Sequence, residues 1–432
     1  MRFPGKKSRA ILDKAKLYYA TNTAASSALV ATGKDAIITD PDGLQYIDLH
    51  CGAGVNNIGM DHPQLKAALM AQAETGIIHS ESHNAPNPIA IELAELLATT
   101  CPLKRPSKGF FSNSGAEANV AAIKACMAYR FHHGEKNTRR KVMYFENGFA
   151  GRMLGLLAAT TSNPEAQRDP FWTHCDQENT IYLPYPTRAN ADLLKERLSA
   201  IDLCEVDYLL IEIPCQGEGG IIYADEETLK FLYETTQAAG IFWISDAIQC
   251  GMGRCGVLYG PELFPWLESD ILTLGKALGG GFAMGGTVFR ADLDWQQSEH
   301  SNTFGGGPFP CRLALVMIQE VKKLLAAGEV DVIAGAINSL AAFLTKHPCV
   351  TEVRGRGAMW AIELATPNLR DALIRIGEET AAGEGYGFKL LAAGEKSVRI
   401  MPPLNIGYNL MILAIRLIGL ALYEVDARHS ST

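Results

Sequence analysis

The sequence lacks several features that mark other classes of protein. Lys and Arg number 39 against 47 Asp and Glu, so the formal net charge is −8, without the basic excess of a nucleic-acid binder. The ten cysteines are scattered and show none of the tight, repeated spacings of a disulfide framework. We therefore expect reduced cysteines in a cytoplasmic protein that has no nucleic-acid partner.

Long apolar runs are missing as well. No apolar stretch follows the charged residues near the N-terminus, and we expect no signal peptide. The most apolar segment, 410–422, is shorter than the ~20 residues of a membrane span, and Arg416 interrupts it. This segment is predicted to be a buried helix, and no membrane association is expected. Internal repeats, low-complexity tracts and long linkers are absent from the sequence too.

The sequence does contain a long alternation of strand-like and helical segments. A chain of 432 residues exceeds the roughly 250–300 residues at which single cores stop growing, which predicts more than one unit. The alternation between residues 109 and 290 favours an α/β fold with a mainly parallel sheet. We predict an N-terminal segment contributing to a small domain, a large domain and a C-terminal small domain, over residues 1–55, 56–315 and 316–432.

The element predictions follow apolar periodicity and turn residues. A hairpin is predicted over 35–50 around a Pro/Asp/Gly turn. Strands are expected at 109–112, 141–145, 208–213, 241–245, 271–274, 286–290, 350–354, 357–364 and 397–400. Helices are expected at 64–75, 88–99, 116–132, 191–201, 226–239, 369–380 and 409–425, with long helices over 312–346.

Two motifs lie at the ends of predicted strands. One is suited to bind an anion, and the other offers a carboxylate to a cation. The run from Ser112 to Glu117 opens a helix, where unpaired N–H groups and the helix dipole favour phosphate. An ordinary helix cap explains this run equally well. Asp246 ends another predicted strand, at the edge where open α/β sheets bind ligands. A capping role is the equal alternative for this carboxylate.

Two further motifs are rich in glycine. Lys276 follows a predicted strand and lies beside Gly275 and the glycines at 279–281. A lysine desolvated in such a place becomes a nucleophile for carbonyl groups, although an isolated loop lysine is more often simply exposed. Thr303, before the glycines at 305–307, offers a hydroxyl to an anion or merely lies in a turn.

The four motifs together match the needs of pyridoxal 5′-phosphate. Its phosphate needs N–H donors, its aldehyde needs a lysine, and its pyridinium nitrogen needs a carboxylate. From about Tyr46 to Leu404 the chain resembles the class III pyridoxal-phosphate-dependent aminotransferases, the family of ornithine, acetylornithine, 4-aminobutyrate and lysine ε-aminotransferases. The resemblance implies fold type I of this cofactor's transferases, with a mainly parallel seven-stranded sheet in the large domain and a smaller α+β domain.

The resemblance also implies roles for individual residues around this cofactor. Lys276 would form the Schiff base and carry the proton, and Asp246 would pair with the pyridinium nitrogen. The other implied cofactor contacts are Gln249 at the ring 3-oxygen, Phe149 stacked on the ring, and Ser114, Gly115 and Ala116 at the phosphate. No metal site is predicted.

Substrate contacts are implied in the same way. Arg399 would grip an α-carboxylate, a task that suits a bidentate guanidinium. Glu218 would pair with this arginine and release it for differently charged substrates, and Arg152 would bind the distal carboxylate of an ω-amino acid. Thr303 would reach the phosphate of a partner subunit, which implies a homodimer with shared sites.

The chain departs from the family pattern at three supporting positions. Ala150 and Ala247 replace the usual His and Glu, and Glu212 lies one residue further than usual from the Gln-Gly-Glu stretch. These departures put rate and reaction type in question more than cofactor binding. Small residues over 52–55 replace the aromatic residues of ornithine aminotransferases, so ornithine is not a favoured substrate.

The predicted function is transfer of an amino group from an amino acid or ω-amino compound to a 2-oxo acid, 2-oxoglutarate or pyruvate. A racemase, aminomutase or decarboxylase on the same fold is the alternative, because fold does not determine reaction. A nicotinamide-dependent oxidoreductase would instead use the G-x-G-x-x-G run at 251–256, although poor helix material follows it. A non-catalytic binding protein is the weakest reading, since all the cofactor motifs are kept.

Overall fold

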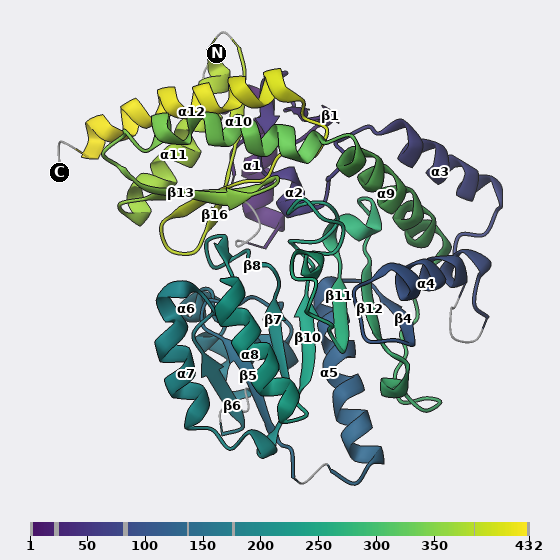
Figure 1. Ribbon diagram of the computed structural model, residues 1–432. Helices are drawn as coiled ribbons and strands as arrows, with labels where there is room; N and C mark the ends of the chain where they lie inside the picture. Colours follow the sequence, from purple (N-terminus) through teal and green to yellow (C-terminus); the bar gives the residue numbers. More distant parts are fainter. Residues whose placement is uncertain are drawn as a thin grey trace. The chain divides into compact units, whose positions relative to one another are not determined.

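The structure is a computed structural model that describes residues 3–20, 26–80, 85–135, 138–174, 178–383 and 385–429 (Figure 1). The chain separates into two compact units. The larger unit comprises Gln64–Lys322, and the smaller one combines Met1–Pro63 with Lys323–Thr432. The domain limits given above, at 55/56 and 315/316, stay a prediction.

A seven-stranded sheet forms the centre of the larger unit, in the order β4-β12-β11-β10-β7-β5-β6. Its strands are β4 (Ser107–Ser112), β5 (Lys141–Phe145), β6 (Thr180–Leu183), β7 (Val206–Glu212), β10 (Phe242–Asp246), β11 (Ile271–Leu274) and β12 (Gly285–Arg290). Neighbours pair in parallel except around β12, which is antiparallel to both β4 and β11. The predicted mainly parallel, seven-stranded sheet is confirmed.

The remaining elements of the larger unit are helices, short 3-10 turns and one small hairpin. The α-helices are α3 (Pro63–Glu74), α4 (Pro88–Thr100), α5 (Gly115–His132), α6 (Pro164–Gln167), α7 (Ala191–Ser199), α8 (Glu226–Ala238) and α9 (Pro308–Ala326). The 3-10 turns are η2 (Leu154–Ala159), η3 (Asp169–His174), η4 (Arg188–Asn190), η5 (Leu203–Glu205), η6 (Pro261–Leu263), η7 (Lys276–Gly279) and η8 (Ala291–Leu293). The hairpin consists of β8 (Cys215–Gln216) and β9 (Ile222–Tyr223).

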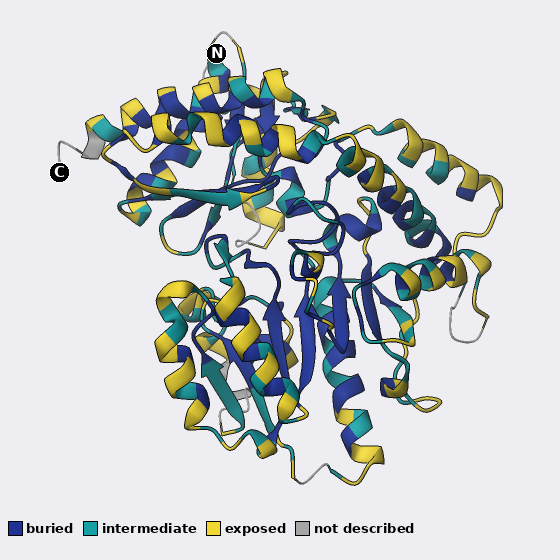
Figure 2. Cartoon of the chain, viewed as in Figure 1, coloured by how far each residue is buried: buried dark blue, intermediate teal, exposed yellow. Residues whose placement is uncertain are grey.

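Helices cover both faces of this sheet. All seven residues of β7 are buried, as expected for a central parallel strand. Leu209 and Ile211 pack in one core with α7 and α8, whereas Tyr208 and Leu210 pack in another with α5. Figure 2 shows the central strands β7, β10 and β11 buried, the edge strand β6 mostly intermediate, and the outer faces of α7 and α8 exposed. Asp246 and Lys276 lie at the carboxyl ends of two of these strands.

The smaller unit contains two four-stranded sheets, β1-β2-β3-β15 and β13-β14-β17-β16. Its strands are β1 (Thr32–Lys34), β2 (Ile37–Thr39), β3 (Gln45–Asp48), β13 (Val350–Arg356), β14 (Met359–Leu364), β15 (Gly387–Lys389), β16 (Leu391–Ala393) and β17 (Ser397–Ile400). Its helices are α1 (Lys6–Tyr18), α2 (Cys51–Gly54), α10 (Glu329–Leu344), α11 (Pro367–Glu379), η9 (Thr380–Ala382) and α12 (Tyr408–His429). The predicted hairpin forms as antiparallel β2 and β3.

The predicted C-terminal helix forms as α12, which packs against α10 and α11 with Ile415, Ile418 and Leu422 fully buried. Across the described ranges, no single helix has the length and hydropathy to cross a membrane. Helices α9 and α10 have sufficient length and hydropathy only when they are taken together, and the chain bends between them.

Candidate functional site

Three segments of the larger unit meet at the carboxyl ends of its strands. Asp246 ends β10, Lys276 follows β11, and α5 begins at Gly115 just after β4. A Cβ on Gly115 would lie 2.8 Å from the side chain of Ile248, and a Cβ on Gly275 would lie 3.2 Å from the Cα of Gly115. Glycine at both positions thus permits the close approach that brings the predicted phosphate, carboxylate and lysine motifs together.

The start of α5 is organised as an anion cradle. Ser114 caps the helix, its Oγ accepting a hydrogen bond of 3.1 Å from the N–H of Glu117. The Glu117 carboxylate in turn accepts bonds of 2.8 and 3.0 Å from the backbone and side chain of Asn113. Gly115 and Ala116 belong to the first turn, whose N–H groups have no intrahelical acceptor. The residues present therefore fit a phosphate group.

Asp246 is a buried carboxylate with two donors aimed at it. Its Oδ2 accepts a bond of 2.8 Å from Asn119 Nδ2, and its Oδ1 accepts one of 2.9 Å from the N–H of Ile248. Burial raises the pKa of Asp246, while both hydrogen bonds and the charge of Lys276 act to lower it. Such a held carboxylate suits a cationic ring nitrogen as its partner.

Asn119 also contacts this cluster and was not among the residues predicted from the sequence. It is fully buried in α5 and makes two further hydrogen bonds. Its Nδ2 donates to the carbonyl of Ala150 at 3.0 Å, and its Oδ1 accepts from Thr273 Oγ1 at 2.7 Å. One side chain therefore links the loop after β5, the end of β10 and β11. A single amide on an otherwise alanine-rich helix face is the signal that marks it.

Lys276 occupies a backbone conformation that favours glycine. Its φ is +46°, a left-handed value that is uncommon for a residue with a side chain and is maintained only where surrounding structure enforces it. The side chain is partly exposed. Its charge lowers the pKa of both Asp246 and Glu212, which places the ammonium group in the same charged cluster.

Glu212 is a second buried carboxyl group at this edge, opposite Asp246 in the register of β7 and β10. Its Oε1 accepts a bond of 2.9 Å from the N–H of Phe149, and its Oε2 accepts one of 3.0 Å from the N–H of Gly217. Burial, and then the charge of Asp246, raise the pKa of Glu212 to about 8. In the sequence this residue differs from the family only in its spacing from the Gln-Gly-Glu stretch. In the structure its hydrogen bonds hold two loops of the site in place.

The two loops fastened by Glu212 carry other predicted site residues. Phe149 is half-buried, and the guanidinium carbon of Arg152 lies 5.4 Å from its ring centroid. Glu218 follows Gly217 and is partly buried, while Gln249 is buried three residues after Asp246. The structure thus places each of these residues on a loop that contacts or continues from the carboxylate pair.

Two further predicted residues belong to other segments of the chain. Thr303 is exposed in a segment that Asn302 fastens, its Nδ2 donating to the carbonyl of Phe111 at 2.9 Å. Arg399 belongs to β17 of the smaller unit, where it is buried and donates from one terminal nitrogen to the carbonyl of Ala392 at 2.8 Å. Burial, Lys389 and Arg399 lower the pKa of His50 in that unit to about 4.

The two alanine departures are buried and bonded through their backbone. The N–H of Ala150 donates to Thr160 Oγ1 at 3.2 Å, and that of Ala247 donates to the carbonyl of Thr273 at 3.0 Å.

The segment 251–256 forms turns, and the next helical element begins only at Pro261. A helix to receive a dinucleotide's pyrophosphate does not open there, which counts against the nicotinamide hypothesis. In the described part of the chain, no group of three or more His, Cys, Asp or Glu side chains could hold a metal ion.

The family model and the similar proteins point to the same family. The model of the family "Aminotransferase class-III" matches residues 18–422. An acetylornithine aminotransferase of Methanosarcina mazei is 32% identical over 404 residues, with 92% of each chain covered. One of Methanocaldococcus jannaschii is 34% identical over 398 residues, which cover 91% of this chain and 93% of the relative.

Solved structures share the fold. The ornithine aminotransferase of Toxoplasma gondii superposes with a TM-score of 0.84 at 24% identity, covering 98% of this chain and 96% of that one. A thermostable omega transaminase of Pseudomonas jessenii gives a TM-score of 0.85 at 22% identity, covering 96% and 98%. The chain belongs to the class III aminotransferases, enzymes that transfer amino groups with pyridoxal 5′-phosphate as cofactor.

Proposed function

We propose that Lys276 and Asp246 are the catalytic residues of this transamination. Pyridoxal phosphate supplies a ring that accepts electrons when a bond to the substrate Cα breaks. Lys276 would hold the cofactor through its aldehyde and would move the proton, and Asp246 would pair with the protonated ring nitrogen. The observation that carries this proposal is the convergence of a buried, doubly hydrogen-bonded Asp246 with Lys276 and the start of α5.

The remaining cofactor contacts are proposed on the same arrangement. Ser114, Gly115 and Ala116 hold the phosphate, supported by the capped first turn of α5. Phe149 stacks on the ring and Gln249 bonds its 3-oxygen. The bond from the Phe149 N–H to Glu212 supports the first of these roles, because it fixes the loop beside the carboxylate pair.

The substrates are an amino donor and a 2-oxo acid, for which we propose 2-oxoglutarate or pyruvate. Arg399 binds the α-carboxylate of the substrate. Glu218 pairs with Arg399 when another substrate needs a site without that positive charge. Arg152 binds the distal carboxylate. Burial of Arg399 in β17 supports its role, since a buried guanidinium binds a carboxylate strongly. Because relatives are named acetylornithine aminotransferases, acetylornithine is the first donor to test.

We also propose a cytoplasmic homodimer in which Thr303 reaches the phosphate of the partner subunit. Exposure of Thr303 on a fastened segment supports this contact. Nine cysteines fall within the described residues as thiols, and eight of these are buried, which favours a reducing compartment.

The deciding experiment combines one variant with one screen. Purified protein should be yellow, and Lys276→Ala should lose the covalent link to the cofactor and all turnover. Amino donors are then screened with 2-oxoglutarate, with pyruvate and with no acceptor. Turnover that requires an acceptor supports transamination, whereas equal turnover without one would indicate a racemase, aminomutase or decarboxylase. A colourless protein that retains no cofactor would contradict the proposed site.

A further inference from the structure

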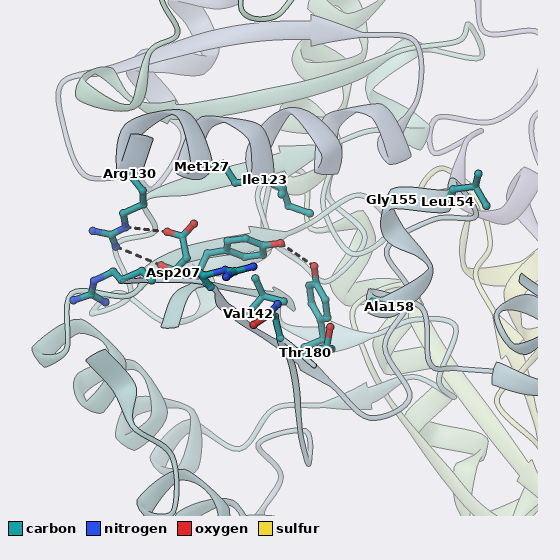
Figure 3. A pocket seen from close by; sticks show the side chains of 14 residues that line it. Ile123, Met127, Arg130, Val142, Leu154, Gly155, Ala158, Thr180 and Asp207 are labelled. Carbon is teal, nitrogen blue, oxygen red and sulfur yellow. Dashed lines mark hydrogen bonds and ion pairs between the residues drawn. The ribbon is translucent and has the colours of Figure 1, made fainter. Parts of the chain in front are cut away.

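The larger unit contains a cavity of about 450 Å³ that is separate from the cofactor site. Its floor is formed by the starts of β5, β6 and β7, and its walls are α5 and η2 (Figure 3). Asp207, near the start of β7, lines the cavity, whereas Glu212, at the end of β7, contacts the loops of the cofactor site. The cavity and the cofactor site therefore lie at opposite ends of this strand. At ~3.3 Å per residue they are about 16 Å apart along the strand. A volume of this size suits a small organic molecule.

Apolar side chains from α5 and η2 line the cavity together with polar groups, among them Asn179, Thr180 and two tyrosine hydroxyls. Ile123 and Met127 reach it from α5, and Leu154 stands on the side away from Arg130 (Figure 3). Deep in the floor, the hydroxyl groups of Tyr144 and Tyr208 lie 2.9 Å apart in a hydrogen bond, and both rings are buried. An apolar body with one hydroxyl or carbonyl group matches this interior.

The rim carries more positive than negative charge. Arg130 is saturated, since it bonds Asp207 at 2.9 Å, Glu135 at 2.6 Å and the carbonyl of Gly240 at 2.7 Å. Arg139 is held in place because its terminal nitrogens donate to the carbonyls of residues 206 and 239, each at 2.8 Å.

Arg140 is the remaining cation at this rim. Its side chain is exposed, and among the described residues none forms an ion pair with it. Among the described residues that line the cavity or pair with its arginines, three guanidinium groups therefore face two carboxylates, those of Asp207 and Glu135. The unmatched charge at the rim of an apolar cavity selects for a molecule with one anionic end.

We propose that this cavity is a binding site for a small aromatic carboxylate. The carboxylate pairs with Arg140, the ring lies between α5 and the sheet, and a polar group at the far end of the ring meets the Tyr144–Tyr208 hydroxyl pair. The ligand is bound without reaction, because Lys276 and Asp246 lie at the other end of the strands.

The test uses 4-hydroxyphenylacetate as the probe and the holoenzyme as the protein. Calorimetric titration should give saturable binding of one molecule per chain, with a dissociation constant of about 1 mM or lower for a ligand of this size. Because the probe's carboxylate also suits Arg399, the titration is repeated with Arg399→Ala holoenzyme, where the binding should persist. Binding that disappears with Arg399→Ala would assign the probe to the active site and overturn the proposal.

Two variants probe the cavity itself. Arg140→Ala should weaken binding about 10- to 100-fold, the loss expected for a charge-assisted hydrogen bond, and Arg140→Lys should restore part of it. Gly155→Leu should abolish binding by filling the cavity. A Cβ at Gly155 meets no atom within 4 Å, and its φ is not left-handed, so the substitution is accommodated without backbone strain.

Matched controls separate these effects from general ones. Arg188→Ala removes another exposed arginine, and Gly335→Leu adds the same side chain to another glycine with open space around its Cβ. Neither residue lines the cavity, and both variants should bind the probe normally. Normal binding to Gly155→Leu, or no saturable binding to the native holoenzyme, would refute the site. Neither result depends on whether the proposed catalytic residues are correct.

Discussion

Replacement of Asn119 by alanine tests the hydrogen-bond network under the cofactor site. The variant loses three buried hydrogen bonds, to Asp246, Ala150 and Thr273. A bond to a charged group contributes about 1.5–3 kcal/mol and each neutral one about 1 kcal/mol, so Asn119→Ala should lower the free energy of unfolding by about 4 kcal/mol. The melting temperature should fall by about 5–10 °C.

The same substitution should change how cofactor binding depends on pH. The hydrogen bond from Asn119 helps to lower the pKa of Asp246, which burial raises. Without that bond the carboxyl group protonates at a higher pH and stops neutralising the ring nitrogen. The visible absorbance of the bound cofactor, followed from neutral to acidic pH, should therefore be lost at a higher pH in Asn119→Ala than in the native enzyme.

Thr273→Val supplies the matched control for this experiment. It removes only the hydrogen bond to Asn119 Oδ1 and leaves the donor to Asp246 in place. It should cost about 1–2 kcal/mol in unfolding free energy without moving the pH midpoint. If both variants shift that midpoint equally, or if Asn119→Ala leaves it unchanged, Asn119 does not set the ionisation of Asp246.

Three further outcomes are expected. Gly115→Ala should weaken cofactor binding because its Cβ meets Ile248 at 2.8 Å, and the added substitution Ile248→Ala should restore binding; a tightly binding single variant would refute the close-approach argument. In the cofactor-free protein, stability should fall as pH rises from about 4.5 to 8, since folding favours the protonated form of Glu212 over that range. Glu212→Gln should reduce this fall in denaturant unfolding, and an unaltered slope would contradict the raised pKa. Arg399→Ala should raise KM for the 2-oxo acid about 10- to 100-fold while leaving the cofactor's absorbance intact, and an unchanged KM would refute its role.

Much of the fold follows from local sequence pattern. The strands β5, β11 and β17 have the bounds predicted from their apolar runs. The predicted strand at 357–364 begins only at Met359, because Gly357 adopts a left-handed φ of 59° and turns the chain between β13 and β14. The short strands β6, β15 and β16 were not predicted from the sequence.

Some site residues can be recognised from the local sequence, whereas others depend on contacts with distant segments. Asp246, Lys276 and Ser114 stand at strand or helix ends, where chain-local pattern reveals them. Asn119 and Glu212 acquire their roles from contacts with segments far along the chain, and Glu212 meets Asp246 only through the register of β7 and β10. No local pattern encodes such a register, so the sequence can mark these two residues as unusual but does not identify their partners.

The antiparallel strand β12 has a consequence for the order of folding. It is the last strand of the central sheet to be synthesised, yet it joins β4, one of the first, to β11. Because α5 starts where β4 ends, the phosphate cradle cannot be positioned until Gly285 pairs with Ser112 across more than half of the larger unit. Contacts so distant in sequence form slowly. Recovery of cofactor affinity during refolding should therefore lag behind recovery of helix content, and a nascent chain that ends before β12 should lack the cradle.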